Sequence, residues 1–458
     1  MKSIFCLSPI DGRYAQKVNK LRPLLSEYGL MYYRVYIEIE WLKHLSRQNE
    51  IVEILSLSEK AYGDLDLIIT EFSETDATRI KQIEESINHD VKAVEYFIKE
   101  KIQISEELCK ITEFVHFSCT SEDINNLAYG LMLKQSMTKV IIPKISLVKD
   151  AIKQMAKDYR SQPMLSRTHG QAASPTTMGK EMANFCYRLQ RQLQNLKNIE
   201  YLGKFNGAVG NFNAHIAAYP TLNWPKISRE FVEQQGLTYN PLTTQIEPHD
   251  YITECFDVIC HINTIMINFS RDIWSYISLN YFKQKIIINE VGSSTMPQKI
   301  NPIHFENAEG NLGMATSILK HLGQTLPVSR LQRDLTDSTV LRNVGVGLSY
   351  SLIAYQAILI GIKKLEINRD SMLSDLRTNI TVLSEAVQMV MRRYGVEKPY
   401  EKLKKLTRGK KISFQTLMDF IDQLQLPPVA KSKLKEIEPE SYIGLAEELS
   451  EICQKDLQ

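Results

Sequence analysis

Residues 256–277 place their apolar side chains three or four positions apart, which is the period of an α-helix. These apolar positions are Phe256, Ile259, Ile262, Met266, Phe269, Ile273 and Ile277. A periodic run of about twenty residues is long for a helix of an ordinary globular domain and suits a helical bundle. Steps of the same kind run from Ile145 to Tyr159. We therefore predict an all-α chain built around long helices.

Residues 343–362 carry no charged side chain and are long enough to cross a bilayer. The same run contains polar groups, among them Asn343, Ser349, Tyr355 and Gln356. A helix inside a protein bundle is apolar on all sides and can place such groups against neighbouring helices. We predict a buried bundle helix here rather than a membrane span.

The chain has 458 residues, enough for two or three domains with a large core. Its last part, from about residue 368, is richer in charged residues than the segments before it. We predict an N-terminal helical domain at 1–119, a central long-helix bundle at 120–367 and a small C-terminal helical domain at 368–458.

The net charge and the cysteine content limit the possible partners and cellular location of the protein. The formal net charge is +2, which favours neither nucleic acid nor a membrane as a partner. The seven cysteines are odd in number, scattered and without a Cys-x-x-Cys pair, a pattern typical of reduced thiols. The apolar run at the N-terminus is too short for a signal peptide. We expect a cytoplasmic protein.

The segment Val-Gly-Ser-Ser-Thr-Met-Pro-Gln-Lys-Ile-Asn-Pro occupies residues 291–302. Gly292 gives its start freedom to move, Lys299 supplies a positive charge and Asn301 supplies hydrogen-bond donors. Ser293 can act as a base where it is desolvated. This combination suits a site that holds a carboxylate and removes a proton beside it. A Ser/Pro surface turn is the alternative interpretation.

A second segment, Ser-Arg-Thr-His-Gly-Gln at 166–171, follows Pro163 and is predicted to be a loop. It places His169 between a hydroxyl residue and a glycine. A histidine flanked in this way can be held in one tautomer and donate a proton near neutral pH. A purely structural histidine is the alternative.

Two further segments have the pattern of helix starts. Thr120 and Ser121 precede an apolar helical run, and Asn88-His89-Asp90 precedes another. Residues of these types favour helix N-caps, and we expect Asn88 or Asp90 to be the cap of the second helix. A helix N-terminus is also an anion site, because its unpaired N–H groups point outward.

Residues 333–342 combine two arginines with a helix start. Asp337 is the expected cap, which places Ser338 and Arg342 on one helix face, with Arg333 approaching from the preceding loop. Two guanidinium groups and a hydroxyl form a good phosphate clamp. Arginines in surface ion pairs are the alternative for this segment. Near the N-terminus, Arg13 adds another cation beside an aromatic residue, and a plain turn around Asp11-Gly12 is the alternative there.

The pattern Gly-Ser-Ser-x-Met-Pro-x-Lys-x-Asn-Pro at 292–302 resembles the signature of the fumarase/aspartase superfamily, whose members eliminate fumarate from substituted succinates. The resemblance implies an all-α, three-domain fold with a long central helical bundle that forms tetramers. It implies that Ser293 is the general base and that Lys299 and Asn301 hold the succinyl carboxylates. It also implies that His169 is the general acid.

Further motifs narrow the resemblance to the bacterial adenylosuccinate lyase family, over nearly the whole chain. They include Ser-Pro-Ile-Asp-Gly-Arg-Tyr from residue 8, Asn-His-Asp-Val-Lys-Ala-Val-Glu-Tyr from residue 88 and Gln-Arg-Asp-Leu-Thr-Asp-Ser from residue 332. The residues that this likeness implies at the substrate are Arg13, Tyr14, Asn88, the second catalytic histidine His89, Asp90, Thr120, Ser121, Gln245, Asn307, Arg333, Ser338 and Arg342.

The resemblance implies one type of reaction. Fumarate would be eliminated from adenylosuccinate to give AMP, and from its aminoimidazole counterpart SAICAR to give AICAR, in purine nucleotide biosynthesis. No metal or cofactor is implied. The family also implies a homotetramer whose active sites are shared between subunits.

One position departs from the family pattern. Residue 298 is Gln, where adenylosuccinate lyases of this kind usually have His, and Met-Pro-Gln-Lys is common in argininosuccinate lyases. Argininosuccinate lyase or another fumarate-releasing lyase is therefore one alternative. An inactive scaffold of the same superfamily is another, although the motifs at Ser293, His169 and Lys299 are intact.

Overall fold

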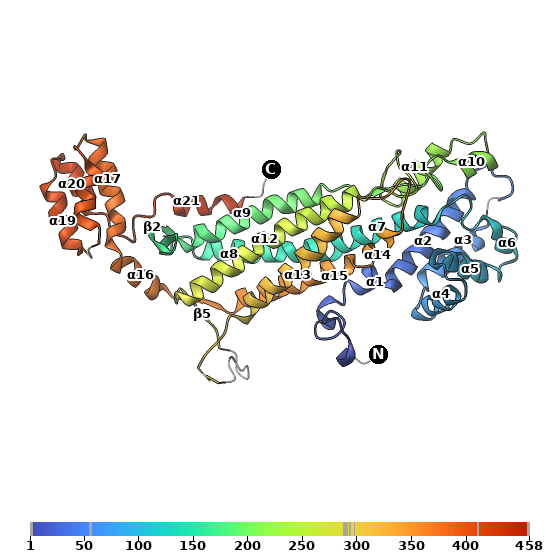
Figure 1. Cartoon of the computed structure of the whole chain (residues 1–458), viewed down its shortest axis with the longest axis horizontal. Helices are drawn as coiled ribbons and strands as arrows, with labels where there is room; N and C mark the ends of the chain where they lie inside the picture. Colours follow the sequence, from blue (N-terminus) through green and yellow to red (C-terminus); the bar gives the residue numbers. More distant parts are fainter. Residues whose placement is uncertain are drawn as a thin grey trace. The chain divides into compact units, whose positions relative to one another are not determined.

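The computed structural model describes residues 3–54, 57–286, 292, 295–296, 298–409 and 412–455. Helices dominate this part of the chain, which otherwise contains three two-stranded sheets (Figure 1). The predicted all-α class is confirmed. The chain divides into two compact units.

Unit 1 comprises Met1–Ile145, Gln194–Thr264 and Gly310–Tyr355. Its N-terminal elements are η1 (Ser3–Phe5), η2 (Ala15–Val18), α1 (Arg22–Leu25), α2 (Glu27–Leu45), α3 (Glu59–Thr70), α4 (Glu74–Ile87), α5 (Asp90–Ile102), α6 (Glu106–Cys109), η3 (Thr112–Phe114), α7 (Ser121–Ser136) and the π-helical turn η4 (Met137–Ile141). Its later elements are β3 (Leu202–Gly203), α10 (Asn213–Ala218), α11 (Trp224–Gln234), β4 (Thr238–Tyr239) and α14 (Thr336–Leu341). β3 and β4 pair in parallel.

Unit 2 comprises Ser146–Leu193, Ile265–Glu309 and Gln356–Gln458. Its elements are β1 (Pro163–Thr168), β2 (Gln171–Thr177), β5 (Phe282–Gln284), β6 (Leu365–Ile367), α16 (Arg369–Thr378), η5 (Ile380–Leu383), α17 (Ser384–Arg393), α18 (Pro399–Thr407), α19 (Phe414–Gln423), α20 (Pro428–Lys435), α21 (Ala446–Ser450) and η6 (Ile452–Gln454). β1 pairs with β2 and β5 with β6, both antiparallel. The helices from α17 to α20 enclose an apolar cluster that includes Met391, Leu417 and Ile421.

The long helices contribute residues to both units. They are α8 (Ile142–Asp158), α9 (Met178–Lys197), α12 (Asp250–Ser278), α13 (Ile303–Thr325) and α15 (Val344–Lys363). α12 has 29 residues, and Phe256, Ile259 and Met266 of the predicted apolar stripe are fully buried. The long helix predicted from periodicity is confirmed.

The uncharged run at 343–362 forms α15. In the described part of the chain, the stretch Thr336–Lys363 is long and apolar enough to cross a membrane by length and composition, and about two thirds of its apolar window (67%) is buried. Two of its polar groups, Ser351 and Tyr355, have a partner in unit 1. Asn263 donates to Ser351 Oγ at 3.1 Å and accepts from the Tyr355 hydroxyl at 2.6 Å. The predicted buried helix is confirmed.

Helix α2 is buried on nearly every side and carries charged side chains into the interior of unit 1. It begins at Ser26, whose Oγ accepts from Gly29 N, and it packs against α1, α5 and α7. Arg34 and Glu38 lie on this helix and are both buried. Buried charges are costly unless they are paired, so each points to a partner on a neighbouring element.

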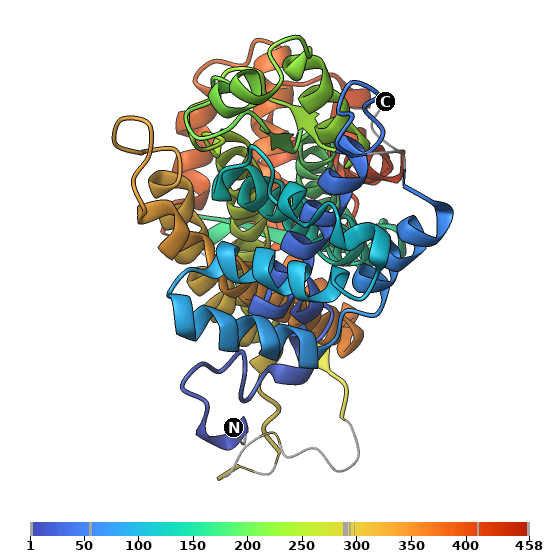
Figure 2. The same ribbon diagram turned by 90° about the vertical axis from the view of Figure 1, so that its right-hand side faces the viewer.

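Helices α4 and α5 form a tight hairpin and lie side by side (Figure 2). The chain reverses at Asn88, which ends α4 in the left-handed conformation with φ 55°. Asparagine adopts this conformation more readily than most residues. The reversal places Asn88, His89 and Asp90 at one end of the helix pair.

The loop predicted after Pro163 is wrong, because residues 163–177 form the β1–β2 hairpin. His169 and Gly170 make its two-residue turn, with φ of 53° and 74°. Positive φ at both turn positions matches the right-handed twist of paired strands. Arg167 anchors the hairpin by donating to the Tyr281 hydroxyl at 3.0 Å.

Candidate functional site

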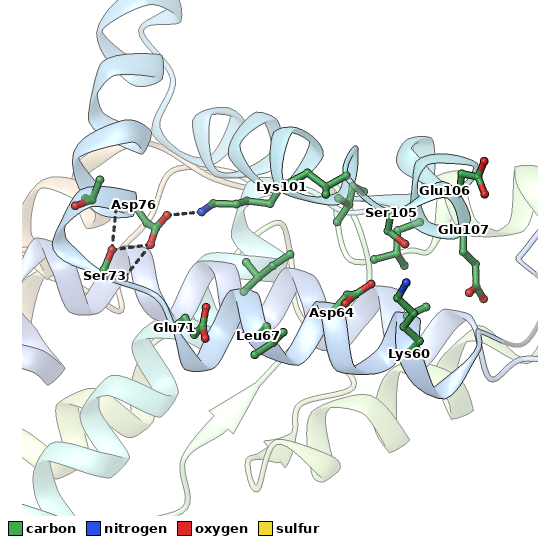
Figure 3. A pocket seen from close by; sticks show the side chains of 16 residues that line it. Lys60, Asp64, Leu67, Glu71, Ser73, Asp76, Lys101, Ser105, Glu106 and Glu107 are labelled. Atoms are coloured by element: carbon green, nitrogen blue, oxygen red, sulfur yellow. Dashed lines mark hydrogen bonds and ion pairs between the residues drawn. The ribbon is translucent and has the colours of Figure 1, made fainter.

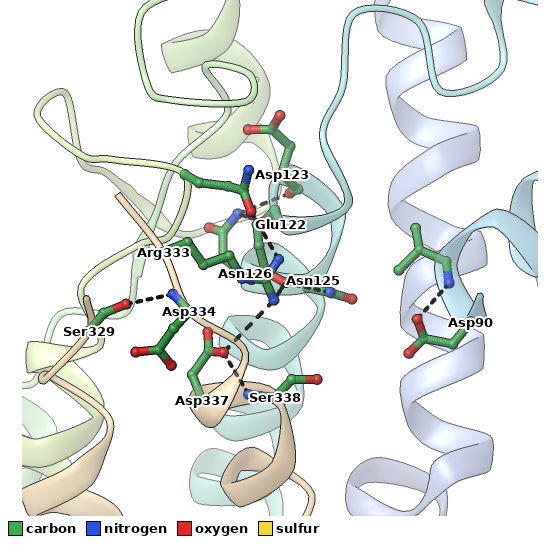
Figure 4. A network of polar contacts seen from close by, with 12 residues as sticks. Asp90, Glu122, Asp123, Asn125, Asn126, Ser329, Arg333, Asp334, Asp337 and Ser338 are labelled. Atoms are coloured by element: carbon green, nitrogen blue, oxygen red, sulfur yellow. Dashed lines mark hydrogen bonds and ion pairs between the residues drawn. The ribbon is translucent and has the colours of Figure 1, made fainter. Parts of the chain in front are cut away.

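Arg333 lies at the centre of a polar network in unit 1 (Figure 4). Its Nη2 lies 2.8 Å from Glu122 Oε1, and its Nη1 donates to Gln245 Oε1 at 3.1 Å. Gln245 also donates to the carbonyl of Ala208 at 2.9 Å. The structure therefore brings together the predicted residues Arg333 and Gln245, which come from distant parts of the sequence.

Asp90 is a second centre of charge in unit 1. Its Oδ2 lies 2.8 Å from Arg34 Nη2 and 3.1 Å from Arg342 Nη2. Burial acts to raise the pKa of Asp90, but Arg34, the N–H of Val91 and Arg342 together more than offset that effect and hold the pKa below its usual value. Arg342 also lines a cavity of about 210 Å³ together with Arg22 and Ser8. Asp90 and Arg342 are thus direct partners.

Ser338 and Arg342 both lie at α14, but the predicted cap is wrong. The N-cap of α14 is Leu335, and Asp337 lies inside the first turn. The Asp337 side chain is buried, 3.5 Å from His249 Nε2 and 3.8 Å from Arg333 Nη2. Asp337 therefore faces the interior of the unit, while its Oδ1 still accepts from Ser338 N at 2.7 Å.

The start of α7 is tied to a buried ion pair. Thr120 is the N-cap, as expected, and its N–H donates to Asp123 Oδ2 at 2.8 Å. Lys204 Nζ lies 2.9 Å from Asp123 Oδ1, and neither side chain is exposed. Asp123 also accepts from the backbone N–H groups of Asn206 and Gly207. These contacts fix the positions of Thr120 and its neighbour Ser121, both partly buried.

His215 is fully buried near this ion pair, and neither ring nitrogen has a hydrogen-bond partner among the described residues. Burial lowers the pKa of His215 to about 4, with Lys204 adding to the effect and Asp123 opposing it. An unfolded histidine titrates near 6.5. Between these two pH values the unfolded chain binds more protons, so the group destabilises the fold as the pH falls from about 6.5 to 4.

Replacing His215 by phenylalanine is expected to flatten this part of the stability profile. The wild type should lose roughly 3 kcal/mol through this group across the interval, and none above it. Urea unfolding at pH 7.5, 6.5, 5.5 and 4.5 measures the slope for both proteins. An unchanged slope in His215→Phe would show that other groups carry the acid sensitivity.

The predicted cap of α5 is also wrong. His89, rather than Asn88 or Asp90, is the N-cap, and its Nδ1 accepts from Lys92 N at 3.1 Å. An Nδ1 that accepts from a backbone N–H carries no proton, so a neutral His89 carries its proton on Nε2. The ring is exposed, and it offers a donor rather than a base from that nitrogen.

The N-terminal turn carries the remaining predicted residues of unit 1. The amide of Tyr14 donates to the carbonyl of Pro9 at 2.7 Å, so this segment does form a turn. Tyr14 packs against a cluster that includes Ile10 and Tyr350, whereas Arg13 is exposed.

In unit 2, His169 stands at the tip of the β1–β2 hairpin. Its side chain is exposed, and the two turn residues hold its backbone in one conformation. The imidazole thus points outward from a backbone held in one conformation, which suits a proton donor that meets a bound molecule.

The signature segment is only partly described. Asn301 Nδ2 donates to the carbonyl of Gly292 at 3.0 Å, and Lys299 is exposed. A Cβ on Gly292 would clash with the Lys299 carbonyl oxygen, so the close backbone approach requires glycine here. Ser293 lies outside the described residues. Asn307 lies in the first turns of α13 and is partly buried.

A cavity of about 950 Å³ lies among α3, α4, α5 and α6 of unit 1 (Figure 3). Its lining includes the acids Asp64, Glu71, Asp76, Glu106 and Glu107 and the lysines Lys60 and Lys101. An excess of carboxylates repels a polyanionic ligand, and none of the predicted residues lines it. No three His, Cys, Asp or Glu side chains are grouped for a metal ion in the described part of the chain.

The sequence motifs did not single out Arg34 or Lys204. Both are charged residues in otherwise apolar or glycine-rich surroundings, and that contrast is the signal that points to a buried partner. Glu122 and Asn125 closely follow the predicted residues Thr120 and Ser121, but their partners Arg333 and Arg34 lie far away in the sequence.

Comparison with known proteins places these residues in a family. The family model described as Lyase matches residues 12–317, and the one described as Adenylosuccinate lyase C-terminal matches residues 329–443. The adenylosuccinate lyase of Haemophilus influenzae is 57% identical over 98% of this chain and 99% of its own length. The chain belongs to the adenylosuccinate lyase family. The adenylosuccinate lyase of Escherichia coli is also 57% identical to this chain, over 97% of this chain and 98% of its own length.

Solved structures extend the likeness to the fold. A fumarate lyase from Mesorhizobium sp. BNC1 matches with a TM-score of 0.77 at 18% identity, covering 95% of this chain and 97% of its own. A 3-carboxy-cis,cis-muconate lactonizing enzyme from Pseudomonas putida matches with a TM-score of 0.73 at 19% identity, covering 95% and 96%. The predicted family, superfamily fold and lyase activity are confirmed.

Proposed function

We propose that this chain eliminates fumarate both from adenylosuccinate, giving AMP, and from SAICAR, giving AICAR, in purine nucleotide biosynthesis. The observation that carries the proposal is the 57% identity to adenylosuccinate lyases over nearly the full length of both chains. Its substrates are small-molecule purine nucleotides, and the reaction uses neither a metal nor a cofactor.

Proton removal starts the elimination. Ser293 takes a proton from the carbon next to a succinyl carboxylate, and the negative charge that develops moves onto the carboxylate oxygens. The positive charge of Lys299 and the amide N–H groups of Asn301 stabilise that charge, with further donors from Thr120 and Ser121. The helix N-terminus behind Thr120 supports this role, since its N–H groups attract anions.

Proton delivery completes the elimination. The C–N bond breaks, its electron pair stays on nitrogen, and His169 supplies the proton to that nitrogen. The outward-facing turn of the hairpin supports this assignment. His89 acts as the second catalytic histidine, and its capped Nδ1 favours hydrogen-bond donation through Nε2.

The nucleotide half of the substrate is proposed to bind the arginines of unit 1 and the further residues named below. Arg333, Ser338 and Arg342 surround the phosphate and ribose. The other proposed nucleotide and substrate contacts are Arg13, Tyr14, Asn88, Asp90, Gln245 and Asn307. The direct pairing of Arg333 with Gln245 and of Arg342 with Asp90 supports one shared binding region.

The assembly is proposed to be a cytoplasmic homotetramer, with each active site built from several subunits and without a nucleic-acid or membrane partner. Within each chain the proposed domains are 1–119, 120–367 and 368–458. The exposed position of His169 supports this assembly, because a proton donor on the surface of one chain leaves room for residues of another subunit to complete the site around it.

Turnover by the purified protein tests the proposed reaction. We expect loss of adenylosuccinate and SAICAR absorbance with release of fumarate, and a loss of kcat of about 10²–10⁴-fold in Ser293→Ala. Argininosuccinate is the control substrate, because Gln298 matches the signature common in argininosuccinate lyases. Turnover of argininosuccinate alone would overturn the substrate assignment, and turnover of none of the three would favour an inactive scaffold.

A further inference from the structure

We propose that Arg34, Asn125 and Glu122 are positioning residues that hold the nucleotide-binding arginines in place. The inference rests on the proposed function, because it assigns these three residues a task in binding the same substrate. None of them is expected to touch the reacting atoms. Their task is to join Arg333 to Asp90 and Arg342 through hydrogen bonds, of which the two made by the Asn125 side chain are buried.

The first half of this relay runs from Arg333 to Asn125 (Figure 4). Arg333 Nη2 lies 2.8 Å from Glu122 Oε1, and the same oxygen accepts from Asn125 Nδ2 at 2.7 Å. Glu122 and Asn125 are buried on α7, 3% and 8% exposed. One oxygen of Glu122 therefore holds both Arg333 and Asn125, in a buried position where solvent does not screen the interaction.

The second half runs from Asn125 to Arg342. Arg34 Nε donates to Asn125 Oδ1 at 2.8 Å, and its Nη2 lies 2.8 Å from Asp90 Oδ2. Arg342 Nη2 lies 3.1 Å from the same Asp90 oxygen. The neutral Asn125 amide lies in the middle of this line, and each of the three guanidinium groups has a carboxylate neighbour that sets its direction.

Arg34 is the link that lysine cannot replace. Its guanidinium group is planar and carries donors in several fixed directions, two of which are used here on different elements. A lysine ammonium on a flexible stem would keep the charge and lose the simultaneous contact with Asn125 and Asp90. Because Arg34 is only 3% exposed, water cannot readily take over a lost contact.

The relay acts on binding rather than on the chemical step. It meets Arg333, Asp90 and Arg342, which are proposed nucleotide contacts, whereas the proposed base and acid are Ser293 and His169. Loosening it should weaken binding of the nucleotide part of the substrate and of AMP. Binding of free fumarate, which lacks that part, should be unaffected.

Two conservative variants test the proposal in the full-length protein. Arg34→Lys keeps the charge, and Glu122→Gln keeps the shape and the acceptor for Asn125. Each should raise KM for adenylosuccinate and the inhibition constant of AMP about 10- to 100-fold, as expected for a lost charge-assisted hydrogen bond. The inhibition constant of fumarate and kcat should stay within about twofold of wild type, a range small against the loss expected for a catalytic group.

Arg79→Lys is the matched control, because Arg79 pairs with Glu100 on the exposed faces of α4 and α5. We expect Arg79→Lys to keep the wild-type KM and AMP inhibition constant. If Arg34→Lys and Glu122→Gln also kept both values, the inference would be overturned and the proposed function would stay intact. An equal rise in the inhibition constants of AMP and of fumarate would also overturn it, since general loosening of the fold would weaken the binding of both. A wild type without turnover would overturn the proposed function itself.

Discussion

Replacing His169 by asparagine is expected to lower kcat for adenylosuccinate by about 10²–10⁴-fold, the usual contribution of a general acid. The fold should be unaffected. His169 occupies a left-handed turn position with φ 53°, which asparagine tolerates, and Asn-Gly is the favoured pair for a two-residue hairpin turn of this kind. The variant thus removes the imidazole and retains the hairpin.

Gly170→Ala is the matched control for this experiment. Gly170 has φ 74°, so alanine strains the same turn by about 1 kcal/mol while the imidazole remains. We expect a smaller loss of kcat in this variant and a lower midpoint of thermal unfolding. Wild-type kcat in His169→Asn would exclude His169 as the acid, and a lowered unfolding midpoint there would mean that the turn itself had changed.

The long helices could be predicted because their determinants are local. The apolar stripe of α12 and the lack of charge in all but the last residue of α15 are visible in consecutive residues, and burial of those residues follows directly. The β1–β2 hairpin could not be predicted in this way. Its strands carry mixed polar and apolar residues, and Arg167 is held by Tyr281, 114 positions further along the chain.

The candidate site shows the same division. The cap at Thr120 follows from residue type and spacing, whereas His89 is a cap because its ring happens to reach Lys92 N. Arg34 and Asp90 lie 56 positions apart, and Lys204 lies 81 positions from Asp123. Pairings of that range come from tertiary packing, so only an isolated charge within an apolar or glycine-rich stretch indicates them.

Replacing Lys204 by methionine is expected to lower the free energy of unfolding by about 3–5 kcal/mol, the usual cost of removing one partner of a buried ion pair. Neither Lys204 nor Asp123 is exposed, and Lys204 Nζ also donates to the Gly207 carbonyl at 3.1 Å. The variant leaves Asp123 as a buried carboxylate held by backbone N–H groups alone. Denaturant midpoints at one protein concentration measure the loss.

Lys81→Met is the control, since Lys81 pairs with Glu27 and Glu84 at the surface, and its loss should cost less than about 1 kcal/mol. Adding Asp123→Asn to Lys204→Met should not restore stability. Asp123 accepts from the N–H groups of Thr120, Asn206 and Gly207, and an amide nitrogen would point hydrogens at some of those donors. Recovery in the double variant would mean that charge alone, rather than this hydrogen-bonded geometry, holds the start of α7.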